Sequence, residues 1–248
     1  MKKLCCILLL LTIVLSFAAC RQEKSTNVTM YIPDTIEVYM GDGTKYAAVS
    51  YVFEEGWQEK ESFTATVSGD IDALGGGGTT VYSNKKTTQE VSNGATMEIE
   101  YNDKGQQILM INRYANGGRR EVAYTYDAVG RVVSQEEKMY ETADSEAITT
   151  TTEYTYTDTE TGSTAIQEVN GYVLLSDYDK NGRQISQSVM INDKETNRTE
   201  VTYDAFGNMV SQITYANGEK QMEMKYTWKA VEVSNEVAAR LPQFNKEK

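Results

Sequence analysis

Histidine is absent from this chain of 248 residues, and its absence limits the chemistry available to the protein. Mechanisms in which an imidazole acts as general base, nucleophile or metal ligand are excluded. The sequence also contains no G-x-S-x-G nucleophile motif and no phosphate-binding loop. The glycine run at 75–78 is interpreted as a loop, because no helix carrying a lysine follows it. We therefore expect no cofactor and no metal centre.

Cysteine is scarce, and all three cysteines lie near the N-terminus, as Cys5, Cys6 and Cys20. Two lysines precede an apolar run over residues 4–15, which is too short to span a bilayer comfortably. The run leads into the segment Phe17-Ala18-Ala19-Cys20, which resembles the lipobox of bacterial lipoproteins. In that family the signal is cut before the cysteine, which is then acylated. The resemblance implies a signal peptide over 1–19 and lipidation of Cys20. Phe17 departs from the family pattern, which usually has leucine, and an uncleaved membrane anchor is the alternative.

The charge of the chain is strongly acidic, with 36 Asp and Glu against 24 Lys and Arg and a net charge of −12. Such a surface repels the phosphates of nucleic acid and argues against a polybasic contact with anionic lipid. We therefore predict an extracytoplasmic protein that is anchored to the bacterial cell membrane by the acyl chains on Cys20. Without a second cysteine in the exported chain, stability must come from core burial and strand pairing.

Four copies of one short phrase organise the second half of the chain. The copies read Tyr101-Asn102-Asp103-Lys104-Gly105, Tyr126-Asp127-Ala128-Val129-Gly130, Tyr178-Asp179-Lys180-Asn181-Gly182 and Tyr203-Asp204-Ala205-Phe206-Gly207. Their tyrosines are 25, 52 and 25 residues apart, so the long gap holds one degenerate unit, which we assign to Tyr154-Thr155-Tyr156 and the loop 157–162. A fixed period of this size marks a repeat architecture.

Each copy of the phrase predicts a tight hairpin turn. The Asp or Asn after the tyrosine caps the turn through its side chain, and the glycine accepts a positive φ. A second turn with Asn-Gly alternates with it, at Asn116-Gly117 and Asn217-Gly218. Each unit therefore holds two strands and two turns. A calcium site is the less favoured interpretation of the turn acids, because each hairpin offers one acid and Ca²⁺ needs six or more oxygens.

These phrases resemble the YD repeats of the RHS family, which read Tyr-Asp-x-x-Gly followed by Arg or Asn. Arg131, Arg183 and Asn208 extend the match to the sixth position, whereas the first copy departs at Asn102 and Gln106. The resemblance implies a strip of β-hairpins. Large members of the family curl into shells around a toxin domain, but this chain is too short for a shell and nothing in it looks like the toxin. The resemblance therefore implies the strip of β-hairpins for this chain, but not the activity of the large family members.

The strands between the turns alternate in polarity. Met222, Met224, Tyr226 and Trp228 fall on one face, which we expect to be buried, and Glu223 and Lys225 fall on the other, which we expect to be exposed. The prediction is an all-β fold, an antiparallel β-meander of hairpin repeats of about 25 residues with a one-sided or curved sheet. The repeat tyrosines are expected to stack where the hairpins meet, rather than to form an exposed row that binds sugars.

The chain divides into six predicted segments. They are the signal 1–19, a tether 20–27, an N-terminal β module 28–70, a Gly-rich connection with a first transition strand 71–94, the YD-like repeat region 95–230, and a tail 231–248. Strands of the module are expected near 29–32, 35–40, 45–53 and 62–68. The tail is expected to hold a short helix from Asn235 to Arg240, stopped by Pro242.

Three hypotheses for the function follow. The first is a non-enzymatic, lipid-anchored protein with a binding or structural role, whose partner is an envelope protein or a glycan. The second is a carrier or chaperone that holds an apolar guest on a curved sheet, for which an open apolar groove is the discriminating feature. The third is a small glycosidase that takes a carboxylate pair from Glu54, Glu55, Asp70 and Asp72, with Trp57 facing the sugar. The first is favoured, and no catalysis is expected.

Overall fold

The computed structural model describes residues 27–70, 78–90, 94–169 and 172–247. The predicted signal, the lipidation site Cys20 and Asp72 lie outside the described residues. The described chain forms one antiparallel sheet of 17 strands and a short helix near the C-terminus.

The strands have the following bounds. The first ten are β1 (Asn27–Met40), β2 (Lys45–Phe53), β3 (Phe63–Gly69), β4 (Thr79–Ser83), β5 (Lys86–Glu90), β6 (Thr96–Tyr101), β7 (Gln107–Arg113), β8 (Arg119–Tyr126), β9 (Val132–Tyr140) and β10 (Ile148–Glu153). The others are β11 (Tyr156–Thr159), β12 (Gly162–Val169), β13 (Tyr172–Asp179), β14 (Gln184–Ile191), β15 (Lys194–Tyr203), β16 (Met209–Ala216) and β17 (Glu219–Ser234), followed by helix α2 (Asn235–Arg240). The two strands expected at 29–32 and 35–40 form one strand, β1, with a register shift between Pro33 and Thr35.

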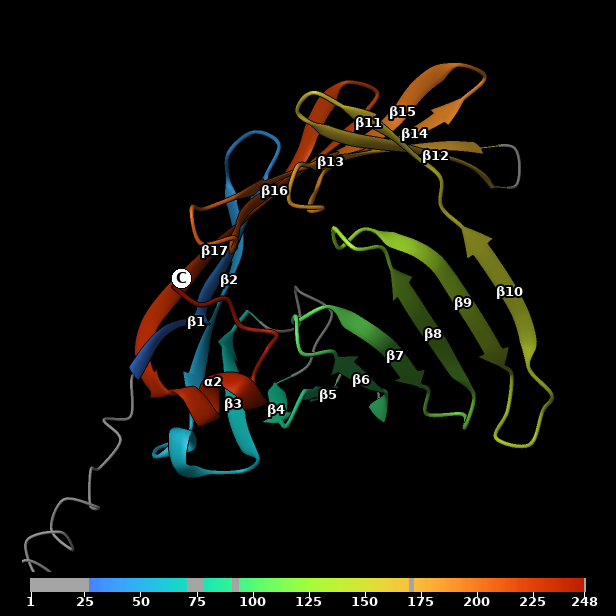
Figure 1. Cartoon of the computed structure of the whole chain (residues 1–248). Coiled ribbons are helices and arrows are strands. Elements are labelled where there is room, and N and C mark those ends of the chain that lie inside the picture. The colour runs from blue at the N-terminus through green and yellow to red at the C-terminus, as the bar shows by residue number, and fades with distance from the viewer. Residues whose placement is uncertain (1–26, 71–77, 91–93, 170–171, 248) are drawn as a thin grey trace, which may run out of the picture.

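The strands follow chain order in a sheet that curves strongly. Each strand from β1 to β10 pairs with the next, and so does each strand from β11 to β17. The two series are joined because β1 pairs antiparallel with β17, from Asn27 opposite Ser234 to Met40 opposite Met222. Within the described residues no backbone ladder joins β10 to β11, so the sheet stays open there. Figure 1 shows the sheet bending from β11 and β12 at the top, past β17 and β1, to β9 and β10 at the right. The predicted all-β antiparallel meander is confirmed.

The repeat turns explain how the strands are aligned. The turn glycines have positive φ, which is 78° at Gly105, 100° at Gly130, 77° at Gly182 and 92° at Gly207. In each of the four units the register also shifts by a bulge immediately before the repeat tyrosine. A bulge increases the local twist of a strand pair. Repetition of the same bulge along the sheet is therefore a local cause of its curvature.

The hydrophobic core lies near the β1–β17 pairing, in the middle of the strand order, where β1, β3 and β17 meet α2 and the tail. The N-terminus of α2 is capped by Ser234, whose hydroxyl accepts the backbone N–H of Val237 at 3.3 Å. Burial of large apolar side chains here is worth about 1.5–3 kcal/mol for each of them. The buried members are Met30, Ile32, Trp57, Phe63, Ala65, Tyr82, Val233, Val237, Ala238, Leu241 and Phe244.

The tail after α2 extends the sheet beside β1. Tyr31 donates its backbone N–H to the carbonyl of Asn245 at 2.9 Å, and Glu247 donates to the carbonyl of Thr29 at 3.0 Å. These bonds occupy the N-terminal half of the β1 edge, because β2 pairs with β1 only from Thr35 onward. The tail is thereby fixed against the core.

The expected burial of one face of β17 is wrong in part. Met222, Met224, Tyr226 and Trp228 are half-buried, and Tyr226 and Trp228 border a cavity instead of a packed layer. Lys225 is exposed as expected, but Glu223 is half-buried because it forms an ion pair with Lys220 at 2.7 Å.

The approach of the tail to the first repeat turn yields a test of this fold. A Cβ on Gly105 would overlap the carbonyl oxygen of Pro242, whereas a Cβ on Gly43, which has a similar φ of 84°, would meet nothing within 4 Å. We expect Gly43→Ala to lower the free energy of unfolding by about 1–2 kcal/mol, the cost of a left-handed alanine. Gly105→Ala should cost more, because it must also displace the tail. Denaturant unfolding of both variants measures the difference, and equal losses would contradict the tail placement.

Candidate ligand-binding site

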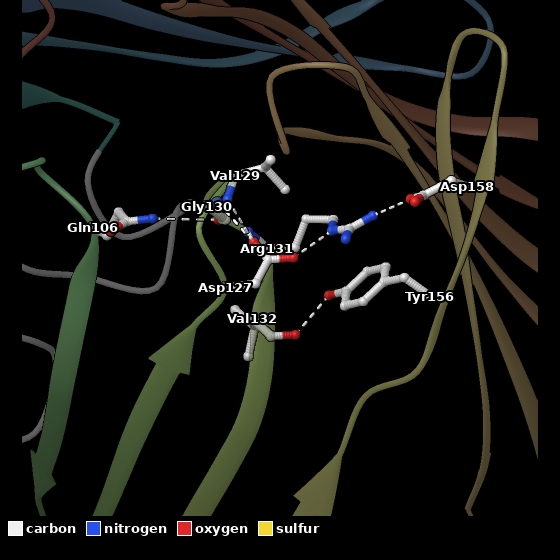
Figure 2. Close-up of polar contacts among 8 residues, drawn as sticks. All are labelled: Gln106, Asp127, Val129, Gly130, Arg131, Val132, Tyr156 and Asp158. Atoms are coloured by element: carbon white, nitrogen blue, oxygen red, sulfur yellow. Dashed lines mark hydrogen bonds and ion pairs between the residues drawn. The ribbon is translucent and has the colours of Figure 1, made fainter.

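Each repeat turn is built around one side chain. The Oδ1 atom of Asp127 accepts the backbone N–H groups of Val129 at 3.0 Å, Gly130 at 2.8 Å and Arg131 at 2.9 Å. Its Oδ2 atom accepts the guanidinium Nε of Arg131 at 2.7 Å. Figure 2 shows the carboxylate between the turn and the arginine. One aspartate thus satisfies the donors of the turn and sets the direction of the basic side chain.

The other copies repeat this arrangement with different partners. Asp179 accepts the N–H and Nε of Arg183, and Asp204 accepts the N–H and Nδ2 of Asn208. In the first copy Asn102 is the capping residue, and its amide donates to Gln106 at 2.8 Å. The predicted turn residue Asp103 lies in this turn, but its side chain points to solvent and pairs with Lys85 at 2.5 Å.

Consecutive units are joined by bonds from ring groups to backbone carbonyls. The accepting carbonyl belongs to the second residue after the preceding turn glycine. The pairs are Tyr126 to Gln107 at 2.5 Å, Tyr156 to Val132 at 2.7 Å, Tyr203 to Gln184 at 2.9 Å and Trp228 to Met209 at 2.8 Å. Trp228 therefore takes the place of a fifth repeat aromatic. Sequence reasoning missed this role because no turn phrase follows Trp228, although it stands 25 residues after Tyr203.

Arginines strengthen two of these joints. The guanidinium of Arg131 lies 4.6 Å from the ring centre of Tyr156, and that of Arg183 lies 4.7 Å from Tyr203. Arg131 also pairs with Asp158 at 2.5 Å, so it links β9 to β11 across the open part of the sheet (Figure 2). The expected column of stacked tyrosine rings is mostly replaced by these polar joints. Among the four phrase tyrosines, Tyr178 is the one in a ring pair, with Tyr156 at 5.2 Å.

The repeat turns and the tail gather inside the curve of the sheet, where Figure 1 shows the hairpin ends converging. Gln106 donates to the carbonyl of Gly130 at 3.4 Å, which joins the first turn to the second. A Cβ on Gly182 would lie 2.9 Å from the carbonyl oxygen of Val129, so the third turn lies against the second. In the fourth repeat turn, the Oδ1 atom of Asn208 accepts the side-chain N–H of Asn245 at 3.0 Å, which joins this turn to the tail. The turns are thus internal packing elements as well as chain reversals.

A cavity of about 270 Å³ lies beside this assembly, on the concave face of the sheet. The residues around it come from both ends of the chain. They are Pro33, Thr35, Ile36, Tyr51, Tyr82, Thr87, Tyr101, Met209, Tyr226, Thr227, Trp228, Gln243 and Phe244. None of these residues is charged, although the protein as a whole carries a net charge of −12. A concave, aromatic lining with a few polar groups is typical of small-molecule sites.

The polar groups of the cavity include tyrosine hydroxyls, the hydroxyls of Thr35, Thr87 and Thr227, and one side-chain amide. Burial raises the pKa of the hydroxyls of Tyr51, Tyr82 and Tyr101, and it raises the pKa of Tyr226 to about 12, so all four are neutral at pH 7. The side-chain amide of Gln243 is also buried, and neither its nitrogen nor its oxygen has a hydrogen-bond partner among the described residues. Buried amides of this kind are rare in proteins.

The residues of the glycosidase hypothesis do not lie together at this cavity, and each has its own contacts. Trp57 is only 6% exposed and packs at 5.0 Å from the ring of Phe63, so it does not face a sugar as the less favoured glycosidase hypothesis required. Glu54 pairs with Lys60 at 3.2 Å, Asp70 accepts the backbone N–H of Ala48 at 3.0 Å, and Glu55 is exposed. Within the described part of the chain, no helix has the length and apolar character needed to cross a membrane.

The comparison with known families finds one repeat segment. Residues 178–220 match the RHS Repeat family, and this stretch contains the third and fourth phrases. The match covers less than half of the chain, so it identifies a repeat and not the family of the whole protein. A comparison with curated proteins finds no match.

A comparison with solved structures finds matches at low sequence identity and low TM-score. A porin-like protein from Bacteroides uniformis is 13% identical with a TM-score of 0.40, over 79% of this chain and 98% of that chain. A domain described as an outer membrane lipoprotein-sorting protein, from Vibrio parahaemolyticus, is 8% identical with a TM-score of 0.31, over 88% and 90% of the two chains. A DUF1329 family protein from Desulfovibrio piger is 7% identical with a TM-score of 0.27, over 86% and 87%. Scores below 0.5 carry no argument about function.

The joints between units predict a measurable loss of stability. Tyr203→Phe removes the hydroxyl that bonds to the carbonyl of Gln184, and it leaves the ring in place. We expect a decrease of about 1 kcal/mol in the free energy of unfolding. Tyr46→Phe is the matched control, because Tyr46 is 58% exposed and should change stability little. Equal effects in denaturant unfolding would show that the joint does not contribute.

The turn aspartates predict a dependence of stability on pH. Burial raises the pKa of Asp127 and Asp179, but the bonds from Arg131 and Arg183 outweigh it, and the pKa of both carboxyls is lowered. A lowered folded pKa stabilises the protein above the unfolded value of about 3.9, and this contribution is lost as the pH falls through the folded pKa. Asp179→Asn keeps the acceptor, as Asn102 does in the first unit, but removes the charge.

We therefore expect Asp179→Asn to be less stable than the wild type at pH 7 and to lose less stability on acidification. Denaturant midpoints between about pH 6 and pH 2 measure this difference. The control is Asp144→Asn at an exposed loop position, whose profile should follow the wild type. An unchanged pH profile in Asp179→Asn would contradict the role of the charge.

Proposed function

We propose that this chain is a lipid-anchored, extracytoplasmic protein of the bacterial cell envelope, and that it binds an uncharged, largely apolar ligand in the cavity of its concave face. It performs no catalysis in this proposal. The observation that carries the proposal is an aromatic cavity without charged residues in a strongly acidic protein. Of the sequence hypotheses, this geometry favours a binding or carrier role over a purely structural one.

The origin of the cavity walls supports a binding role. Tyr51 comes from β2, Tyr82 from β4, Tyr101 from β6, Trp228 from β17 and Phe244 from the tail. Tyr51, Tyr101 and Trp228 are only half-buried, although aromatic rings are the residues that bury the most surface, whereas Tyr82 and Phe244 also belong to the hydrophobic core. A sheet with a structural role alone gains stability by filling such a space. A space that is kept open and lined by rings is better suited to a ligand.

Acylation of Cys20, if it occurs as proposed, would bring this cavity to a membrane surface. Cys20 stands seven residues before the first strand, Asn27–Met40, so acylation would hold the sheet close to the bilayer. Several acyl chains together give stable anchoring, which the acidic surface could not give by electrostatic attraction. A membrane-proximal protein with an apolar cavity is suited to ligands that partition into lipid.

The anchoring is tested by Cys20→Ser in the full-length chain. The substitution removes the acylation site, and we expect the exported protein, with its signal cut elsewhere, to appear in the soluble fraction of lysed cells. Fractionation with mass spectrometry of the N-terminus gives the measurement. A wild-type chain that carries no acyl group would refute lipid anchoring. A Cys20→Ser chain that stays membrane-bound would indicate an uncleaved anchor.

The binding role is tested with the neutral fluorescent probe N-phenyl-1-naphthylamine. We expect it to bind the wild type and to change the fluorescence of Trp228, which is read in a Trp57→Phe background. Met209→Phe narrows the cavity and should weaken binding about tenfold, which corresponds to about 1.4 kcal/mol. Met40→Phe is the control, because Met40 is 44% exposed and lies outside the cavity. Equal binding by the two methionine variants would place the probe elsewhere.

A further inference from the structure

We infer that the free edge of β10 is a self-association site, at which two copies of this chain pair through their β10 strands in an antiparallel arrangement around a twofold axis. No residue of β10 lines the ligand cavity, so the inference goes beyond the proposed function and does not depend on it. The observation that carries it is an exposed edge strand whose sequence is complementary to itself in one register.

The strand β10 has a partner on one side. It pairs with β9 from Ile148 opposite Met139 to Glu153 opposite Ser134, and within the described chain no ladder forms on its other side. Figure 1 shows β10 at the right margin of the sheet, with no described segment beyond it. All residues of β10 except Thr152 are exposed, and Ile148 is 62% exposed. The strand is therefore accessible to another chain.

The ladder with β9 determines which backbone groups of β10 remain free. Tyr154, the residue after β10, donates its backbone N–H to the carbonyl of Val133 at 3.0 Å. Because hydrogen-bonded and non-hydrogen-bonded pairs alternate along an antiparallel ladder, every second residue before Tyr154 also bonds to β9. The residues between them, Thr149, Thr151 and Glu153, therefore direct their N–H and C=O groups outward.

The edge lacks the features that normally prevent pairing with another chain. Exposed edge strands are commonly protected by proline, lysine, a bulge or a covering segment. The strand β10 reads Ile-Thr-Thr-Thr-Thr-Glu and pairs with β9 without a register shift. The N-terminal half of β1, by contrast, is covered by the tail. The open edge of β10 is thus suited to pairing.

One register of a β10 dimer uses every outward-facing group of the strand. In an antiparallel pair, an outward-facing residue must lie opposite another outward-facing residue. If Thr151 lies opposite Thr151 of the second copy, Thr149 lies opposite Glu153, and all outward-facing residues of both strands are paired. A shift of two residues moves Thr149 or Glu153 beyond the end of the other strand. The same register places Thr150 opposite Thr152, and cross-strand threonine pairs are favourable.

The charges near the edge do not oppose this register. Glu153 is the one charged residue of β10, and it lies opposite a threonine of the second copy. On β9, Glu136 forms an ion pair with Lys138 at 2.7 Å. Glu137 forms another with Arg120 at 2.8 Å. These acids are neutralised within each copy, so β9 and β10 offer no free acidic row to a basic peptide. A second copy is therefore the better match to this edge.

The size of the edge predicts a weak dimer in dilute solution. A pair of strands of six residues buries less surface than the roughly 1,600 Å² of a stable interface. Anchoring of both copies to one membrane would raise their local concentration. The informative experiment therefore traps the pair instead of measuring its affinity.

The test is disulfide trapping with cysteine substitutions on β10 of the full chain, oxidised with diamide. Thr151→Cys places two thiols on facing residues whose Cα atoms are about 5.5 Å apart, within the range of a disulfide. Thr149→Cys is the matched control, because it is also exposed but its two copies lie about 13 Å apart in this register. We expect Thr151→Cys to form a covalent dimer on the order of tenfold faster. Wild-type protein treated alike reports any contribution of the native cysteines.

A mixture of two variants tests the register itself. Thr149→Cys mixed with Glu153→Cys should give a covalent heterodimer, because these positions face each other between the two copies.

A proline substitution tests the backbone groups. Thr149→Pro in the Thr151→Cys chain removes one outward N–H and leaves the ladder with β9 intact, because that N–H does not face β9. Cross-linking should decrease about tenfold. Thr149→Val in the same chain keeps the N–H and should cross-link like its parent. Circular dichroism checks that each variant is folded.

The outcomes decide the inference without reference to the cavity. Cross-linking of Thr149→Cys that equals or exceeds that of Thr151→Cys would indicate random collision or another register and overturn the inference, and so would a lack of cross-linking in both. Cross-linking that is unchanged by Thr149→Pro would show that the strands do not pair through their backbones. Binding of N-phenyl-1-naphthylamine is measured separately, so failure of the dimer leaves the proposed binding function standing.

Discussion

The arrangement of the curved sheet depends on one side chain in each repeat, the Asp or Asn that follows the repeat aromatic. Its oxygens accept N–H groups of the turn, and this stabilises the conformation in which the following glycine has a positive φ. In the units with arginine, the same carboxylate also directs the guanidinium toward the next aromatic ring. The carboxylate and the arginine lie within five residues of each other, and their bond orients the arginine for its contact with the next unit. The charge-assisted bonds of such a turn are worth about 1.5–3 kcal/mol each.

Because this joint is repeated, almost all neighbouring strands of the sheet are consecutive in the chain. The exception is the long pairing of β1 with β17, which joins the first strand to the last. That pairing places the core beneath α2 and the tail, and it brings Tyr226 and Trp228 into the same cavity lining as Tyr51 and Tyr82. The candidate cavity lies at this junction. The repeats give the sheet its curvature, and the candidate site forms where the first and last strands pair.

The repeat turns could be predicted from the sequence because their determinants lie within one short phrase. The capping by Asp127, Asp179 and Asp204 and the alternation of the strands are local properties of this kind. The pairing of β1 with β17 could not be predicted, because it joins residues about 200 positions apart and no periodic signal links them. The burial of Trp57 was missed because it depends on ring contacts with Phe63 in another segment of the chain, and the half-burial of Glu223 was missed because strand alternation does not show its ion pair with Lys220. The burial of the Gln243 amide results from the position of the tail beside β1, which no pattern in the sequence predicts.

The open position between β10 and β11 has a consequence for how such a chain can change over evolutionary time. Each repeat contacts mainly its neighbours, so a unit can be gained or lost by duplication or deletion with little effect on distant units. The open position lies between strands whose residues do not line the cavity, since the lining comes from β1, β2, β4 to β6, β16, β17 and the tail. A duplication there would enlarge the circumference of the sheet in steps of one hairpin pair. The size of the protein and the selectivity of its cavity are therefore free to evolve separately.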